Sequence, residues 1–478
     1  MLLVYPLFVG FKGYTQLTVS KFIFFAGLTV LWLISLLLAP FILQKSPRVK
    51  GQGFIHCCLL LYLLLCCISA LLSPHGFAVI IGAGRFDGLL TSLLCCFVFF
   101  GVSRFAEMKD SYIYALALSG FICCVIAIIQ LFGANPLALF PSDYDYYDAG
   151  IKFSSEFLGT IGNADLFSAF LCLLLPLSSV FYISSEKRPV VLLPVIAASG
   201  FCLLACRVSG GLVSVLCLAI IAAPLLISNS TRLHRALELL SVLCAALCLA
   251  AGMNGEKSDA GVITIGFIFG RAFYSLLILS VFFAIARLAL RNLHLRAKTL
   301  RLFFSILSVF ITIAGLAAVY FYPGSSGTIY ELSQILHGNV SESFGSSRIL
   351  IWRDTLELSR ERLFLGGGPG TLGLRLDLSF SRYVPETGRT LQTFVDNAHN
   401  EYLGILVNTG LPSLLCYISA QGAALWRAFK LRDTFKYSLC LAASLLCYWI
   451  CSFFGLGLFI VSPIMWIMWG LLCSRRLA

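Results

Sequence analysis

The sequence predicts an all-α polytopic membrane protein with about thirteen transmembrane helices. Apolar residues make up 59% of the 478 residues and charged residues only 12%, and no soluble core of this length absorbs so much apolar surface. The mean hydropathy is +0.94. Apolar runs also recur between short polar gaps at about the length that crosses a bilayer, about 20 residues. This pattern is unlike the weak alternation of a β-barrel strand.

The order of apolar runs predicts the individual spans. They cover roughly residues 22–44, 54–73, 89–106, 111–132, 165–183, 189–205, 208–227, 235–252, 262–285, 300–322, 400–428, 436–455 and 458–473. Alternate loops carry the basic residues, such as "QKSPRVKGQ" after the first span and "RNLHLRAKTLR" after the ninth. By the positive-inside rule these loops face the cytoplasm. The opening "MLLVYPLFVG" is too short to cross and is interpreted as a re-entrant piece or the remnant of a further helix.

This topology divides the chain into three parts. Residues 1–322 form an N-terminal bundle of about ten spans, residues 323–399 one large extracytoplasmic loop, and residues 400–478 about three C-terminal helices. Within the loop, "SSRILIWRDTLELSRERLF" has apolar residues near helical spacing, so we expect a short amphipathic helix that Ser346 or Ser347 caps. The following "LGGGPGTLG" predicts turns. It is not a P-loop, because no GK[ST] follows it.

Charge and cysteine content exclude several classes of function. The net charge of +12 lies mostly in cytoplasmic loops, which indicates topology and not a nucleic-acid partner. The 19 cysteines sit almost wholly within apolar runs, as in "HCCLLLYLLLCC". They are therefore expected to pack as small apolar side chains and predict neither a disulfide framework nor a zinc site.

Three arginines fall on the predicted outer side, close to the ends of spans: Arg85, Arg207 and Arg348. An arginine at the membrane rim is costly without a partner, and this makes each one a candidate functional residue. Guanidinium groups offer a rigid fork of donors that matches phosphate oxygens, so three on one side suggest an anion site. Singly, each could instead be a lipid-headgroup anchor, a helix–helix contact or part of a solvated helix face.

His399 lies where the long outer loop re-enters the membrane, in "DNAHNEYL". We expect it in the first turn of a helix that Asp396 or Asn397 caps. A helix N-terminus disfavours the imidazolium, so the ring would be neutral and able to accept a proton. A purely structural role, in capping the helix or holding the loop, is the alternative.

A second motif, "PSDYDYYDAG", contains a D-x-D pair formed by Asp143 and Asp145. Such pairs hold a divalent metal in some lipid-linked-sugar transferases. No further ligand is evident nearby, and the preferred interpretation is a solvated, tyrosine-rich surface loop.

Several segments in order resemble the bacterial O-antigen ligase family, which also includes O-antigen polymerases and protein O-oligosaccharyltransferases. They are "GRFDGLL", "IIQLFGANPL", "FLGTIGNADLFSAFL", the "SSRILIWRDTLELSRERLFLGGGPGTLG" stretch, "DNAHNEYLGILVNTGLP" and "SFFGLGLFIVSPIMWIMWGLL". The resemblance runs from about residue 80 to the end of the chain. The chain departs from the family at "GNADLF", where Ala164 and Asp165 stand in place of a more usual Pro-Asn, and in its thirteen spans, since twelve are usual for ligases.

The resemblance implies a membrane glycosyltransferase of the GT-C type in the bacterial cytoplasmic (inner) membrane. Such enzymes move a glycan from undecaprenyl diphosphate to an acceptor hydroxyl on the extracytoplasmic side, without a cofactor or a metal. It implies that His399 is the catalytic base and that three arginines bind the diphosphate, namely Arg207, Arg348 and Arg85. The supporting residues would be Asp396, Asn400, Trp352 and Asn163.

The implied partners are the lipid-linked glycan donor, a glycan, lipid or protein acceptor, and the bilayer. Three other readings remain open. A polysaccharide polymerase of the same family differs only in its acceptor. A transporter or flippase for lipid-linked sugars would need ionisable residues at mid-depth and repeated halves. A structural membrane protein would leave His399 and the arginines unrelated in space.

Overall fold

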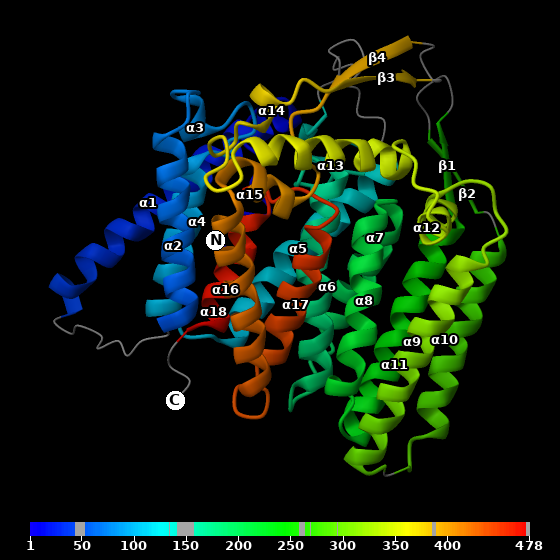
Figure 1. Cartoon of the computed structure of the whole chain (residues 1–478). Coiled ribbons are helices and arrows are strands. Elements are labelled where there is room, and N and C mark those ends of the chain that lie inside the picture. Colours follow the sequence, from blue (N-terminus) through cyan, green and yellow to red (C-terminus); the bar gives the residue numbers. More distant parts are fainter. Residues whose placement is uncertain are drawn as a thin grey trace.

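The computed structural model describes residues 1–43, 53–132, 134–140, 157–257, 263–267, 269–293, 295–384 and 389–474. Long helices pack side by side in a bundle, and a cap of short helices and strands covers one end of it (Figure 1). The predicted fold class is confirmed. The described residues depart from an all-helical fold only in two antiparallel hairpins of two strands each.

Successive long helices of the bundle run in alternating directions. Their bounds are α1 Leu17–Leu43, α2 Gly53–Leu71, α4 Leu89–Phe105, α5 Asp110–Leu131, α6 Ala164–Ser184, α7 Leu192–Ala205, α8 Ser209–Leu226, α9 Ser230–Gly252, α10 Arg271–Ala289, α11 Ala297–Tyr320, α16 Leu411–Lys430, α17 Ser438–Cys451 and α18 Ser462–Leu472. Among the described residues, eight helices are long and apolar enough to cross a membrane, and four shorter apolar helices accompany them.

Two predicted spans differ from the observed elements. The span over 262–285 begins later, because residues 263–267 form strand β2 (Ile263–Phe267), which pairs with β1 (Met253–Lys257). The span over 400–428 is two helices, α15 (Glu401–Thr409) and α16, which meet at Gly410. Gly410 has φ 88°, and a Cβ there would lie 2.2 Å from the Phe364 carbonyl oxygen. The close approach of another backbone thus requires glycine at this junction.

Helix α6 forms the centre of the bundle. Of its most apolar 18-residue window, 94% is buried, and α17 and α18 are likewise mostly buried. The corresponding windows of α10 and α11 are only 6% and 0% buried. These two apolar helices stand at the edge of the bundle (Figure 1), where lipid covers such surfaces. All 19 cysteines are free and most are buried, as small packing residues are expected to be.

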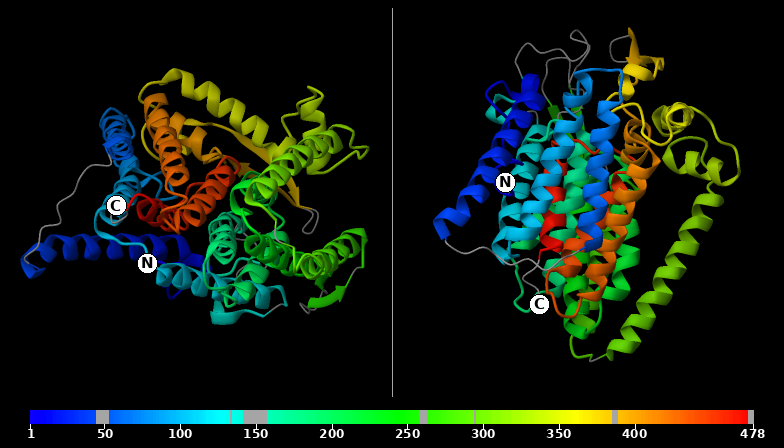
Figure 2. Two further views of the ribbon diagram at one scale, coloured as in Figure 1. Left: turned by 90° about the horizontal axis from the view of Figure 1, so that it is seen from below. Right: turned by 60° about the vertical axis from the view of Figure 1, so that its left-hand side comes forward.

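The first residues of the chain enter the bundle instead of lying on it. Tyr5 is 1% exposed, and its hydroxyl donates to the Phe459 carbonyl. The Pro6 carbonyl accepts from Thr160 at 2.7 Å and from the buried ammonium of Lys21 at 3.3 Å. Residues 2–7 form turns. Helix α1 then slants away from the bundle toward its C-terminal end (Figure 2).

The cap is built from the long loop between α11 and α15. It contains α12 (Thr328–Leu336), α13 (Phe344–Glu361), α14 (Leu372–Arg375) and the hairpin of β3 (Ser379–Val384) with β4 (Arg389–Phe394). Helix α13, the expected amphipathic helix, lies across the ends of the bundle helices (Figure 1). The expected serine cap is wrong, since Ser346 and Ser347 have φ 59° and 65° and no side chain caps the helix.

Candidate functional site

The segment from Asp396 to Glu401 leads from the cap into α15 and carries His399. Asn400 caps the helix, with its Oδ1 accepting from Tyr402 N at 3.0 Å and Leu403 N at 3.1 Å. The predicted caps are therefore wrong. Asn397 instead accepts from the His399 backbone N–H at 3.0 Å, and His399 itself lies before the helix in a left-handed conformation with φ 47°. That uncommon geometry turns its ring out of the helix axis.

Arg85 and Asp396 join the first part of the chain to this segment. The Asp396 carboxylate accepts from Arg85 Nε at 2.7 Å and from Nη2 at 2.9 Å, a bidentate pair. Arg85 sits in the turn between α3 (Ala78–Ile81) and α4, where Gly82 and Gly84 have positive φ. The pair is partly exposed, so its value lies in aligning two loops more than in stability.

Arg348 and Trp352 reach the same segment from α13. The Trp352 indole N–H donates to the Ala398 carbonyl at 3.0 Å, and its ring packs edge-on against Phe453 at 5.4 Å between centroids. One turn earlier, Arg348 Nη2 lies 3.9 Å from Asp165 Oδ1. Arg348 makes no hydrogen bond to any residue within the described ranges. Its fork of donors is therefore uncommitted.

Asp165 belongs to the first turn of α6, which Asn163 caps by accepting from Leu166 N at 3.0 Å. This cap places the Asp165 carboxylate at the rim, beside Arg348. Asn163 thus acts on the site by fixing the start of α6.

His399 lies among these charges. Burial lowers its pKa, Arg348 and Arg85 lower it further, and the carboxylates of Asp165 and Asp396 oppose that effect. Its Nδ1 is buried and has no hydrogen-bond partner in the described part of the protein. The ring is therefore neutral near pH 7 and keeps a nitrogen free to accept a proton.

Arg207 is the candidate that the structure does not bring into contact with this group. It occupies the turn between α7 and α8 with φ 55°, its side chain is exposed, and it forms no ion pair or hydrogen bond among the residues described. Its turn is nevertheless near. Asp165 acts electrostatically on the thiol of the preceding Cys206. A Cβ at Gly210 would lie 2.9 Å from Phe454, a residue in ring contact with Trp352.

The glycine-rich turn after α13 fixes the relative position of three loops. Gly368 N donates to the Asn408 carbonyl at 2.9 Å, and Ala83 N donates to the Gly370 carbonyl at 2.9 Å. A Cβ at Gly366 would lie 2.3 Å from the Asn408 carbonyl carbon. Turn chemistry, as predicted, explains the motif, and the close backbone packing explains why it is glycine.

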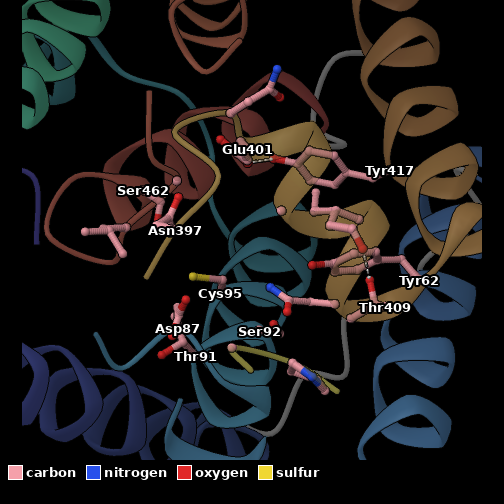
Figure 3. Close-up of a pocket in the computed structure, with 18 of the residues that line it drawn as sticks. Tyr62, Asp87, Thr91, Ser92, Cys95, Asn397, Glu401, Thr409, Tyr417 and Ser462 are labelled. Atoms are coloured by element: carbon pink, nitrogen blue, oxygen red, sulfur yellow. Dashed lines mark hydrogen bonds between the residues drawn. The ribbon is translucent and has the colours of Figure 1, made fainter. Parts of the chain in front are cut away.

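Behind the Asp396–Glu401 segment lies a polar cavity of about 120 Å³ (Figure 3). Asn397, Asn400 and Glu401 form one wall, and Asp87 stands on another. The Glu401 carboxylate accepts from the Tyr417 hydroxyl at 2.7 Å through Oε1. Burial raises the pKa of Asp87. We refer to this space as the Glu401 cavity.

Sequence reasoning missed three acidic residues here: Asp87, Asp165 and Glu401. Each stood inside a quoted motif, "GRFDGLL", "GNADLF" or "HNEYL". A carboxylate next to a rim arginine or at the start of an apolar helix was the available signal. Asp165 appeared only as a departure from a family pattern.

For the D-x-D motif the preferred prediction was a surface loop and not a metal site. Within the described ranges no group of three or more His, Cys, Asp or Glu side chains could hold a metal ion. Asp143 and Asp145, the D-x-D pair, lie outside the described residues.

Comparison with known proteins agrees with the resemblance. Residues 260–418 match the family model described as O-antigen ligase. The chain carries an O-antigen ligase family region. This region contains Arg348, Trp352, Asp396, His399 and Asn400, whereas Arg85, Asn163, Asp165 and Arg207 precede it. A search of curated proteins finds no match to the chain.

The matched family indicates the class of protein that residues 260–418 resemble. O-antigen ligases and the related polymerases are glycosyltransferase-type membrane enzymes, and the apolar helices make this chain a multi-pass membrane protein. The family region supplies two of the groups that meet at His399, and the N-terminal bundle supplies Arg85 and Asp165. The site therefore depends on both parts of the chain.

Proposed function

We propose that this protein transfers a glycan from undecaprenyl diphosphate to an acceptor hydroxyl on the extracytoplasmic side of the bacterial inner membrane. One observation carries the proposal: Arg348 acts electrostatically on His399, and neither the imidazole nor the guanidinium makes a hydrogen bond within the described part of the protein. A neutral base near a cation whose donors are available suits a reaction in which a proton leaves the acceptor as an anion leaves the donor.

The proposed step is a single displacement. The acceptor oxygen attacks the anomeric carbon, and the bond from that carbon to the diphosphate oxygen breaks. His399 takes the hydroxyl proton, and the diphosphate departs with the electron pair. Positioned bases of this kind contribute about 10²–10⁴-fold in rate.

The arginines act on the growing negative charge of the leaving group. Arg348 can present its whole fork, and Arg85 keeps Nη1 free while Asp396 holds Nε and Nη2. Donors aimed at charge that develops in the transition state lower the barrier without tightening ground-state binding. Arg207 would lie at the same rim, where its guanidinium would contact the acceptor or a lipid headgroup.

A polymerase of the same family would use the same groups with a second lipid-linked glycan as acceptor. A transporter is disfavoured, because the ionisable groups at the site gather at one face of the bundle and not at mid-depth. No charged side chain other than Arg85, Arg348, Asp165 and Asp396 acts on His399 within the described part.

The test is glycan transfer by purified protein with a polyprenyl-diphosphate-linked glycan as donor. We expect His399→Ala to abolish transfer while the protein remains folded and inserted. His337→Ala is the matched control, because His337 is an exposed histidine of α12's C-terminal end that stacks on Tyr320. Wild-type transfer by His399→Ala would refute the proposed base.

A further inference from the structure

We propose that the Glu401 cavity is a saccharide subsite that binds one sugar ring through its hydroxyl groups. The inference rests on the proposed function for its biological meaning, and on the cavity itself for its chemistry. The sugar could belong to the acceptor or to the donor glycan, and the experiment below separates these sources.

The buried carboxylate of Glu401 is the first observation. Its Oε1 accepts from the Tyr417 hydroxyl at 2.7 Å, and the Ser452 hydroxyl also acts on the carboxylate. A Cβ at Gly457 would lie 2.7 Å from Oε2, so the Oε2 side of the carboxylate is tightly packed by the protein. Glu401 nevertheless lines the cavity, so a ligand hydroxyl group would donate to the part of the carboxylate that faces this space.

The second observation is the composition of the walls. Among the described residues no lysine, arginine or histidine lines the cavity, so a diphosphate would meet carboxylates there and be repelled. Amides of Asn397 and Asn400 and hydroxyls of Thr91 and Ser92 add donors and acceptors around the space. Such mixed groups match the hydroxyls of a neutral sugar.

Aromatic rings complete the lining. Tyr62, Tyr417 and Trp466 border the cavity, and Tyr62 and Tyr417 are in ring contact at 5.5 Å between centroids. Sugar rings present apolar C–H faces that pack on aromatic rings, which is how a carboxylate and a ring together recognise a carbohydrate. The cavity, of about 120 Å³, has room for one sugar ring.

A cation is the obvious competing ligand, and the arrangement of the carboxyls argues against it. Figure 3 shows Asp87 and Glu401 on separate sides of the cavity. Asp87 interacts electrostatically with Arg85 and Asp396, whereas Glu401 accepts from Tyr417, so the two carboxyls have different partners. Within the described ranges no group of three or more His, Cys, Asp or Glu side chains could hold a metal ion here.

Gly404 offers a direct way to close the cavity. It lines the space on α15, and a Cβ there meets nothing within 4 Å. Gly404→Leu should therefore fill the cavity without displacing backbone. Gly422→Leu is the matched control, because Gly422 is a helical glycine of α16 with equal free space and an exposed position outside the cavity.

The experiment measures binding of free hexoses and N-acetylhexosamines to the full-length protein in detergent micelles, by saturation-transfer difference NMR. We expect at least one sugar to bind the wild type, His399→Ala and Gly422→Leu. Binding should be lost in Gly404→Leu and weakened roughly tenfold in Glu401→Gln, which keeps the shape but exchanges one acceptor oxygen for a donor.

Failure of the inference is distinguishable from failure of the proposed function. If the wild type transfers glycan but binds no sugar in this panel, or if Gly404→Leu binds as well as wild type, the subsite is refuted and the transferase proposal stands. If sugars bind as expected but His399→Ala transfers glycan normally, the proposed base is refuted and the subsite stands. In the transfer assay, Glu401→Gln should raise one KM. If only the KM for the acceptor rises, the bound sugar belongs to the acceptor; if only the KM for the donor rises, it belongs to the donor.

Discussion

The two sides of the Asp396–Glu401 segment carry different chemistry. On the His399 side each arginine stands beside a carboxylate, Arg85 with Asp396 and Arg348 with Asp165. On the cavity side Asp87 and Glu401 stand with hydroxyls, amides and aromatic rings, and no cation lines the space. One side thus suits an anion that can compete for the arginines. The other suits a neutral ligand rich in hydroxyl groups.

The contrast also shows how six residues serve both sides. His399 turns out of the chain at φ 47°, just before Asn400 begins α15, and Glu401 then enters the cavity wall. A regular helix through His399 would have changed the direction of its ring. The left-handed residue therefore separates the two environments.

Among the charged groups at the site, the largest effect is expected from replacing Arg348. Arg348→Gln should lower kcat/KM for transfer about 10²-fold, the scale of losing one electrostatic stabiliser of a transition state. Arg353→Gln on the same helix is the control, because Arg353 is an exposed residue paired with Glu342 and Asp354. Equal activities of the two variants would contradict the difference between the two sides.

The pH dependence of transfer should show which charged groups act on His399, because each variant shifts the acidic limb in a defined direction. His399 must be neutral to act, so kcat/KM should fall below an apparent pKa that lies under the ordinary value of about 6.5. Arg348 lowers the pKa of His399 and Asp165 raises it. Arg348→Gln should therefore move the acidic limb to higher pH, and Asp165→Asn to lower pH.

Glu401→Gln provides the internal comparison for these profiles. Glu401 is not among the groups that act on His399, so the acidic limb should not move in this variant. A shift as large as that of Arg348→Gln would mean that the two sides share one electrostatic environment.

Arg207 is expected to contribute less than Arg348. Arg207→Gly should reduce transfer by a smaller factor than Arg348→Gln, and should raise stability by about 1 kcal/mol, because glycine accepts its φ of 55° without strain. Thermal unfolding and transfer rates in detergent measure both. A loss equal to that of Arg348→Gln would place the guanidinium of Arg207 at the reacting diphosphate.

The smallest effects are expected from the helix caps. Asn400→Ala and Asn163→Ala should each destabilise the fold by about 1 kcal/mol, since each removes one capping side chain. Only Asn400→Ala should also weaken sugar binding, because only Asn400 lines the Glu401 cavity. The two variants, compared by unfolding and by NMR, thus distinguish a cap from a lining residue.

The sequence was sufficient for the membrane fold and for part of the site. Apolar runs and basic loops carry local information, and they predicted the helices and placed Arg85, Arg348 and His399 at the same rim. The pairing of Arg348 with Asp165 joins residues far apart in the chain, and no local pattern encodes such a contact. The same holds for the Arg85–Asp396 pair.

Local signals also failed where backbone geometry was unusual. Asp396 and Asn397 have side chains suited to capping, but Asn400 caps the helix, since His399 adopts positive φ. Ser346 and Ser347 failed as caps for the same reason. Propensity describes preferred backbone states, and residues held outside those states escape it.

Gly345, Ser346 and Ser347 form three successive left-handed residues immediately before Arg348. After these residues, hydrogen bonds hold the chain in place: Trp352 donates to the Ala398 carbonyl, and Gly368 of the glycine turn donates to the Asn408 carbonyl. Ahead of them, Glu331 of α12 receives a bond from the Gly345 amide at 3.0 Å. Hydrogen bonds thus hold the chain on both sides of the kink, and three residues with strained backbone geometry set the direction in which α13 presents Arg348.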